Sequence, residues 1–344
     1  MKALFLDKTD LLSLRDEPLL QPLGDNDVRI KIVNVGICGS DVHYYRHGRI
    51  GGFVVNEPMV LGHEASGTVV ETGLAVKNLK VGDRVCMEPG IPDYGSRETL
   101  RGMYNLDPDV RFWATPPIHG CLRETIVHPA NLTFKLPDNV SFEEGALVEP
   151  LAIGVHAAKK ARVAPGDTAL VLGAGTIGLV TALAAIAAGC SHVIVADSKQ
   201  EKLDFIRDHY DARFSTFNVA SGDLKAHILA EGGVDIVFEA SGSPQAILST
   251  TGFLVPGGKV VLIGMPQAPA PIDIVEAQCK EIEFLTIFRY ANVYDRTIKY
   301  IASGQINVKP LITHRYDFAN VENAFRFAAT MPGDAIKIMI KLPD

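Results

Sequence analysis

The sequence predicts an α/β protein in two parts, a β-rich part and a doubly wound parallel sheet with helices on both faces. Three observations predict this. Up to about residue 150 the chain reads as short strand-like segments separated by Gly, Pro and Asp. Beyond that point apolar strand-like runs alternate with helical ones. The chain has 344 residues, 47% of them hydrophobic, which suffices for two cores.

The expected elements follow in chain order. In the first part we expect strands at residues 28–35, 65–72 and 82–87. In the second part we expect strands at 169–172, 192–196, 234–239 and 258–263, with helices at 176–188 and 199–210. A further strand at 282–288, a helix at 293–303 and a final strand at 335–342 complete the chain.

Charge and cysteine content exclude several classes of protein. The net charge is −7, and the sequence has no basic cluster of the kind that binds nucleic acid. The uncharged run 169–190 is long enough to cross a bilayer, but its glycines favour a buried strand, turn and helix over a membrane span. Five widely spaced cysteines without a CxxC motif indicate a reducing compartment, so we expect a cytoplasmic protein.

A GxGxxG motif lies at the predicted turn between the strand at 169–172 and the helix at 176–188. Its glycines are Gly173, Gly175 and Gly178. They allow a tight turn, a close approach of the backbone to a pyrophosphate, and close packing of helix on strand. The helix N-terminus then offers NH groups to the diphosphate. The pattern predicts a Rossmann domain that binds a dinucleotide.

Asp197 ends the next predicted strand, 19 residues after Gly178. An acidic side chain at about this spacing accepts hydrogen bonds from the adenosine ribose and repels a 2′-phosphate, which favours NAD over NADP. Lys199 and Lys202 lie close by and act in the opposite sense, because a cation can serve a 2′-phosphate.

Three short segments carry side chains that zinc accepts as ligands. Cys38, His63 and one carboxylate, Glu64 or Glu149, would give the three mixed ligands of a catalytic zinc site with one open position. Taken singly, a cysteine such as Cys38 is usually a small core residue, and a histidine such as His63 is usually a hydrogen-bonded structural one.

The same segments form a longer family pattern. Gly62-His63-Glu64-x-x-Gly67, followed by Gly82-Asp83-x-Val85, resembles the zinc-type medium-chain alcohol dehydrogenases. The runs CGSDVHYYRHGRIG, LPDNVSFEEGALVEP and Phe288-Arg289-Tyr290 resemble the polyol branch, the sorbitol and xylitol dehydrogenases, over nearly the whole chain. The run MYNLDPDVRFWATPPIHG is most similar to bacterial xylitol dehydrogenases.

The resemblance implies a domain division and a set of roles. Residues 1–150 and 290–344 would form a GroES-like catalytic zinc-binding domain, and 151–289 the NAD-binding Rossmann domain. Cys38, His63 and Glu64 match zinc ligands, and Glu149 matches an acid that holds the zinc-bound water or approaches the metal. The remaining matches are proton-relay positions at Ser40 and His43, polyol contacts at Tyr44, Glu149, Arg289 and Tyr290, and cofactor contacts at Ile177, Asp197 and Lys202.

One departure from the family concerns a second, structural zinc, which many members hold with four closely spaced cysteines. Residues 86–121 contain no such cluster, so we expect one catalytic zinc per chain. The resemblance also implies a homotetramer.

The expected reaction is NAD-dependent oxidation of a secondary hydroxyl of a small polyol, foremost xylitol to D-xylulose. Zinc would polarise the hydroxyl. Its proton would leave through Ser40, His43 and Glu149, and the nicotinamide would accept the hydride. Sorbitol (L-iditol) or another secondary alcohol or diol is the alternative substrate. A zinc-free reductase or a silent NAD-binding protein is the alternative class.

Overall fold

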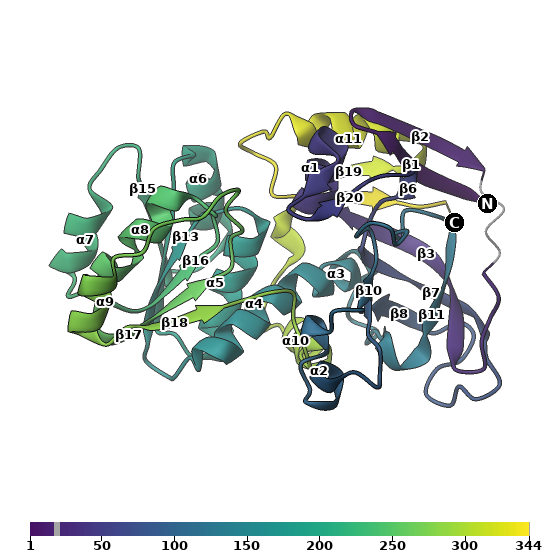
Figure 1. Ribbon diagram of the computed structural model, residues 1–344, viewed down its shortest axis with the longest axis horizontal. Coiled ribbons are helices and arrows are strands. Elements are labelled where there is room, and N and C mark those ends of the chain that lie inside the picture. Colours follow the sequence, from purple (N-terminus) through teal and green to yellow (C-terminus); the bar gives the residue numbers. More distant parts are fainter. Residues whose placement is uncertain (17–20, 344) are drawn as a thin grey trace. The chain divides into compact units, whose positions relative to one another are not determined.

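The computed structural model describes residues 1–16 and 21–343. The chain divides into two compact units. The first comprises Met1–Glu149 and Tyr294–Asp344, and the second comprises Pro150–Val293 (Figure 1). The first unit is therefore built from two separate stretches of chain, whereas the second is continuous.

The first unit is organised around a seven-stranded sheet in the order β12-β8-β7-β3-β20-β19, with β11 also pairing with β3. The long strand β3 (Asp27–Ile37) alternates buried and less buried side chains over its first half and is buried throughout its last four residues. Such a pattern is typical of a strand that enters a core. The other strands are β7 (Glu64–Thr72), β8 (Arg84–Met87), β11 (Thr125–Pro129), β12 (Thr133–Lys135), β19 (Ile312–Asp317) and β20 (Lys337–Lys341).

Smaller elements surround this sheet. The short strands are β1 (Lys2–Lys8), β2 (Leu11–Asp16), β4 (Arg49–Ile50), β5 (Phe53–Val54), β6 (Met59–Val60), β9 (Gly90–Ile91) and β10 (Arg111–Phe112). The helices are α1 (Gly39–His47), α2 (Arg97–Leu100), α3 (Phe142–Ala146), α10 (Tyr294–Ala302) and α11 (Val321–Ala329), and α4 (Val148–Ala161) begins at the end of this unit's first stretch. The 3-10 helices among the described residues are η1 (Tyr104–Leu106), η2 (Ala130–Leu132), η3 (Lys309–Leu311) and η4 (Phe318–Asn320).

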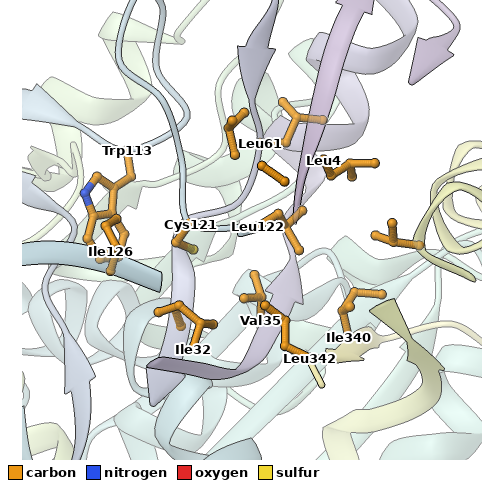
Figure 2. Close-up of a cluster of buried hydrophobic side chains, with 14 of the residues drawn as sticks. Leu4, Ile32, Val35, Leu61, Trp113, Cys121, Leu122, Ile126, Ile340 and Leu342 are labelled. Atoms are coloured by element: carbon orange, nitrogen blue, oxygen red, sulfur yellow. The ribbon is translucent and has the colours of Figure 1, made fainter. Parts of the chain in front are cut away.

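The hydrophobic core of the first unit joins its two stretches of chain. Figure 2 shows Leu4, Leu61 and Leu122 from the N-terminal stretch beside Ile340 and Leu342 from the C-terminal one. These side chains are at most 1% exposed. Full burial of one aliphatic side chain stabilises a fold by about 1.5–3 kcal/mol, so this cluster is a main reason why the C-terminal strand joins the sheet.

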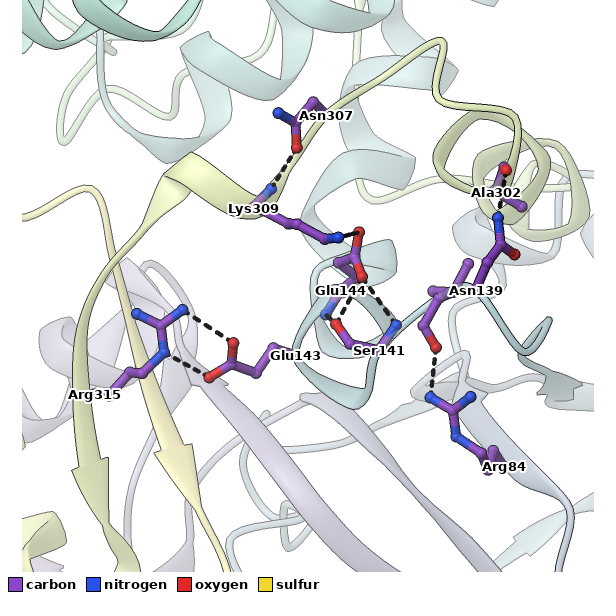
Figure 3. A network of polar contacts seen from close by, with 10 residues as sticks. Arg84, Asn139, Ser141, Glu143, Glu144, Ala302, Asn307, Lys309 and Arg315 are labelled. Atoms are coloured by element: carbon purple, nitrogen blue, oxygen red, sulfur yellow. Dashed lines mark hydrogen bonds and ion pairs between the residues drawn. The ribbon is translucent and has the colours of Figure 1, made fainter.

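Polar contacts around α3 also join the two stretches of the first unit (Figure 3). Ser141 caps α3, and its backbone NH and hydroxyl both donate to the Glu144 carboxylate. Arg315 donates to both oxygens of Glu143 at 2.7 and 3.0 Å, and the Asn139 amide donates to the carbonyl of Ala302 at 2.8 Å. The segment before α3 and α3 itself thus anchor the C-terminal stretch.

The second unit is a six-stranded sheet in which every pair is parallel, in the order β15-β14-β13-β16-β17-β18. Its strands are β13 (Thr168–Leu172), β14 (His192–Asp197), β15 (Phe214–Asn218), β16 (Val234–Glu239), β17 (Leu254–Leu262) and β18 (Glu283–Thr286). The helices between them are α5 (Thr176–Ala188), α6 (Gln200–His209), α7 (Leu224–Ala230), α8 (Pro244–Phe253) and α9 (Ile274–Lys280). The strand order reverses between β13 and β16, which makes this a doubly wound sheet and confirms the predicted fold class.

The apolar run 169–190 is divided between strand β13 and helix α5. The strand is buried within the parallel sheet and the helix is largely buried too, which explains their lack of charged residues. Within the described residues, every helix is too short or too polar to pass through a lipid bilayer.

Candidate metal centre and dinucleotide site

Cys38 lies at the junction of β3 and α1. The strand ends at Ile37, and Cys38 is the N-cap residue of the helix. Its backbone NH donates to Oδ2 of Asp41 at 3.1 Å, a contact that closes the first turn of α1. The backbone on both sides of Cys38 is therefore fixed, and the thiol is held at the buried end of β3.

His63 and Glu64 reach the same place through the antiparallel pairing of β7 with β3. The register sets Glu64 opposite Gly36, two residues before Cys38. A side chain at position 36 would not fit, since a Cβ there would lie 2.2 Å from Oε2 of Glu64. One ligand atom each from Cys38, His63 and Glu64 lies within 4.8 Å of the other two. One sulfur, one nitrogen and one oxygen donor form a set that suits zinc.

Asp41 supports this group and was not singled out by the sequence analysis. Its carboxylate is 0% exposed, and Oδ1 accepts a hydrogen bond from the backbone NH of Gly62 at 3.0 Å. The same oxygen lies 3.7 Å from Nδ1 of His63. This distance is longer than a hydrogen bond, so Asp41 acts on the buried ring through its charge. The spacing Cys-x-x-Asp at a helix start is the local signal that could have identified it.

The surroundings of His63 favour positive charge. Burial alone lowers the pKa of His63, but the negative charges of Asp41 and Cys38 outweigh it and raise the pKa well above its ordinary value. A buried group of anionic side chains is costly unless a cation compensates it. The site is thus matched to a bound cation.

Lys337 supplies one such cation, and sequence reasoning missed it. Its Nζ donates to both oxygens of Glu64 at 2.7 and 2.8 Å and to the carbonyl of Ile37 at 3.1 Å. Burial lowers the pKa of Lys337, but the charges of Glu64, Cys38 and Glu149 raise it above its usual range. The residue starts β20, which pairs with β3, so only the folded sheet brings it to Glu64 across 273 positions.

Glu149, the alternative carboxylate, lies at the start of α4 and is 4% exposed. The cluster of three mutually close ligand atoms contains Glu64 in its place. The charge of Glu149 acts on Lys337 and on Glu88. The structure thus places Glu149 in the same electrostatic neighbourhood as the cluster.

Glu88 is a second acid that the sequence analysis did not identify. It is 3% exposed and accepts a hydrogen bond from the Tyr104 hydroxyl at 2.7 Å. Burial raises its pKa to about 7 against the effect of that bond, and the charges of Glu149 and Asp295 act in the same direction as burial. Glu88 therefore changes its charge near neutral pH.

Helix α1 carries the predicted relay and one of the predicted substrate contacts. Ser40 and His43 are half-buried, and Tyr44 is buried. Burial, and secondly the charge of His47, lowers the pKa of His43. His43 is therefore a neutral imidazole at neutral pH, which can accept a proton.

The dinucleotide motif folds as the sequence predicts. Gly173 follows β13 with φ of 102°, a conformation that favours glycine, and Gly175 is the N-cap of α5. A Cβ on Gly178 would lie 1.8 Å from the carbonyl oxygen of Gly173, so helix and turn approach too closely for any side chain. Ile177 is half-buried in the first turn of the helix.

Asp197 ends β14 beside this turn. Its Oδ2 accepts from the NH of Ala174 at 2.7 Å, and its Oδ1 accepts from the NH of Lys199 at 2.9 Å. Burial lowers the pKa of Lys202, an effect that the charge of Asp197 opposes and that of Lys199 reinforces. The carboxylate is thus fixed at the strand end where a ribose contact is expected.

Glu239 braces the loop on the other side of β13 and was also missed. It is 0% exposed, and its Oε1 accepts from the NH groups of Ser241 and Gly242 at 2.9 and 3.0 Å. Ser241 borders Gly173 so closely that a Cβ on the glycine would lie 3.2 Å from it. A buried carboxylate therefore shapes the loop next to the first glycine of the motif.

The last two predicted substrate contacts, Arg289 and Tyr290, belong to the second unit and follow β18. The Arg289 guanidinium lies 4.8 Å from the centre of the Phe288 ring, and Arg289 has a positive φ of 54°. Tyr290 is buried. The metal-ligand cluster lies in the first unit.

Comparison with known proteins places these features in a family. Residues 24–138 match the model of the alcohol dehydrogenase GroES-like domain, and residues 176–303 match that of the zinc-binding dehydrogenases. The chain is 56% identical to the D-xylulose reductase of Morganella morganii, over 96% of this chain and 98% of that one. It belongs to the zinc-containing medium-chain dehydrogenases, in their polyol branch.

Two further comparisons agree. The bovine sorbitol dehydrogenase is 42% identical to this dehydrogenase over 96% of its length and 93% of the relative's. The crystal structure of an Escherichia coli oxidoreductase/dehydrogenase of unknown specificity superimposes with a TM-score of 0.94 at 37% identity, covering 100% of this chain and 99% of that one. The predicted family and the GroES-like and Rossmann folds are confirmed.

Proposed function

We propose that this dehydrogenase oxidises a secondary hydroxyl of a polyol to a ketose with NAD, and that its foremost substrate pair is xylitol and D-xylulose. Support comes from the relative named D-xylulose reductase, which is 56% identical, against 42% for the bovine sorbitol dehydrogenase. Sorbitol (L-iditol) and other secondary alcohols or diols are the alternative substrates.

The observation that carries the proposal is the close approach of Cys38, His63 and Glu64, with ligand atoms within 4.8 Å of one another. We assign these three residues as the holders of a catalytic zinc ion, and Glu149 as an acid that approaches it. Zinc at such a site supplies Lewis-acid polarisation of a substrate hydroxyl. Lys337 compensates the negative charge of Glu64, and the carboxylate of Asp41 lies 3.7 Å from Nδ1 of His63.

The proton of the substrate hydroxyl must leave before or with the hydride. We assign Ser40 and His43 on α1, together with Glu149, to this transfer. His43 suits an acceptor, because burial and the charge of His47 lower its pKa and leave it neutral.

Specificity for a polyol needs donors and acceptors matched to several hydroxyls. We assign Tyr44, Glu149, Arg289 and Tyr290 to these contacts. Because an unmet buried polar group is costly, such a set discriminates strongly against deoxy analogues.

Cofactor binding would use the backbone of Gly173, Gly175 and Gly178, the side chain of Ile177, and Asp197 and Lys202. The fixed carboxylate of Asp197 supports NAD as the cofactor, since it would repel a 2′-phosphate.

A single zinc per chain is supported by the lobe that follows β9. There the buried Asp107 carboxylate accepts from the backbone NH of Asp93 at 2.6 Å and of Asp109 at 3.2 Å. Hydrogen bonds to Asp107 thus hold together the lobe in which many family members carry four cysteines. We therefore propose no structural zinc.

Three further assignments complete the proposal. Residues 1–150 and 290–344 would form the catalytic domain and 151–289 the NAD-binding domain, a division that differs from the two compact units in placing residues 150 and 290–293 in the catalytic domain. All five cysteines are unpaired with one another, which supports the cytoplasm as the location. A homotetramer is the expected assembly. Light scattering coupled to size-exclusion chromatography measures the mass of the assembly and tests this expectation.

Steady-state turnover of a panel of pentitols, hexitols and simple diols, with NAD and NADP in parallel, tests the proposal. We expect the highest kcat/KM for xylitol with NAD, and one zinc per chain by elemental analysis. Faster turnover of a simple diol than of any polyol would refute the substrate assignment. Full activity without stoichiometric zinc would refute the metal assignment.

A further inference from the structure

Helix α1 carries two histidines, His43 and His47, one helical turn apart. Residues four apart project from the same face of a helix. Their ring centroids are 4.6 Å apart, with the ring planes inclined by 56°. His43 is half-buried and His47 is exposed, so the pair borders solvent.

The ring nitrogens of this pair are available to a ligand. Within the described part of the chain, no hydrogen bond or ion pair engages either imidazole, and the ring contact between them is the interaction they make. By contrast, the ring of His128 is hydrogen-bonded to the backbone carbonyl of Glu88, and the ring of His192 is hydrogen-bonded to the hydroxyl of Ser215.

The spacing of the rings fits one shared metal ion. Late transition metals bind imidazole nitrogen at about 2.0–2.1 Å, which places the centroids of two imidazoles on one tetrahedral ion about 5 Å apart. The observed 4.6 Å is close to this value. Two imidazoles are a ligand set that Zn²⁺, Ni²⁺ and Cu²⁺ accept, and Mg²⁺ and Ca²⁺ do not.

The charge around the pair permits a cation. The nearest basic side chain in sequence, Arg46, has its Nε 3.4 Å from the carboxylate of Asp10, which offsets its charge. Burial, and secondly the charge of His47, lowers the pKa of His43, so one of its ring nitrogens offers a lone pair at neutral pH.

We propose that His43 and His47 form a second metal site, a two-histidine chelate for a divalent late transition ion with water as the remaining ligand. Occupation of this site inhibits the dehydrogenase, because the nitrogen of His43 that binds the ion no longer accepts a proton. The inhibition rests on the proposed function, whereas the binding does not.

Titration of the untagged, zinc-loaded protein with Ni²⁺ in a calorimeter tests the site. We expect the wild type to bind one further ion. We expect the affinity of His47→Gln for this ion to be lower by about tenfold or more. His209→Gln, which changes an exposed histidine at the end of α6, is the matched control and keeps the site. Electron paramagnetic resonance of added Cu²⁺ should show two nitrogen ligands in the wild type that His47→Gln lacks.

Turnover in the presence of Ni²⁺ or excess Zn²⁺ tests the inhibition. With each rate normalised to the same protein without added metal, we expect His47→Gln to resist metal that inhibits both the wild type and His209→Gln. Equal binding of Ni²⁺ by the wild type and His47→Gln would overturn the site. Loss of binding with unchanged inhibition would overturn its link to His43. If the protein lacked dehydrogenase activity, the calorimetric and resonance results would still decide the site.

Discussion

The two units differ in how they use buried charge. Within the described residues, the charged and histidine side chains buried in the second unit are Glu239 and His156. The first unit buries a much larger set: Asp41, His63, Glu64, Asp83, Glu88, Asp107, Arg123, His128, Glu144, Glu149 and Lys337. Burial of charge is costly and is retained where function or paired contacts compensate it. The contrast therefore separates a unit whose chemistry depends on side chains from one whose binding site is mainly backbone.

The largest effect should come from Cys38→Ser, which tests whether the first unit alone carries the chemistry. Lewis-acid stabilisation by a metal amounts to several kcal/mol, so we expect kcat to fall by about a thousandfold or more. The Kd for NAD, measured by fluorescence titration, should stay close to that of the wild type. A parallel loss of NAD affinity would show that the two sites are not separable in this way.

The next largest effect concerns the buried pair of Lys337 and Glu64. Lys337→Met breaks the buried pair in which Nζ donates to both oxygens of Glu64, and breaking such a pair destabilises a protein by about 3–5 kcal/mol. We expect a clearly lower Tm by differential scanning calorimetry. Lys341→Met, at the exposed end of the same strand, is the control and should leave Tm nearly unchanged. Equal effects of the two substitutions would contradict the role of the pair.

A third effect depends on pH and concerns Glu88, whose pKa is raised from 4.5 to about 7. The folded protein keeps this proton between those values while the unfolded chain loses it, so the stabilising difference is complete below pH 4.5 and is lost as the pH rises through 7. The loss amounts to about 3 kcal/mol. Glu88→Gln cannot ionise and can still accept from Tyr104, so it should exceed the wild type in Tm at pH 8 and match it at pH 5.

Glu57→Gln removes an exposed carboxylate of the same unit and controls for the change in net charge. It should shift Tm equally little at both pH values. A gain in stability at pH 8 for Glu57→Gln as large as for Glu88→Gln would assign the effect to overall charge, not to burial.

The smallest effect is expected in the second unit. Asp197→Ala removes the acid that would repel a 2′-phosphate, and we expect the ratio of kcat/KM for NAD over NADP to fall by about tenfold. The maximal rate with NAD should change less than in Cys38→Ser. An unchanged cofactor ratio would show that another residue reads the ribose.

The second unit was the easier one to predict, because its site is local in sequence. Strand β13, the three glycines and helix α5 occupy residues 168–188 without interruption, and the strand and helix lie close to the predicted ranges. A position that needs a positive φ, such as 173, is usually occupied by glycine, so the sequence itself reveals the requirement. The role of Glu239 was not predicted, because a lone acidic residue at a strand end has many possible roles.

The first unit was predicted less completely, because its contacts join distant segments. The ligand candidates Cys38, His63 and Glu64 came from their residue types and the family pattern, but nothing near position 337 pointed to a partner for Glu64. Helix α1 was not predicted either. It is short and polar, and its buried residues are Asp41, Tyr44 and Tyr45, without the apolar period that reveals an amphipathic helix.

The split composition of the first unit has a consequence for biosynthesis. On the ribosome, Pro150–Val293 emerges as one uninterrupted stretch and can complete its parallel sheet early. The partner of Glu64 is Lys337, which is synthesised only after the whole of the second unit. The metal pocket therefore matures after that unit has emerged, and nascent chains stalled before β20 should be the ones that chaperones and proteases recognise.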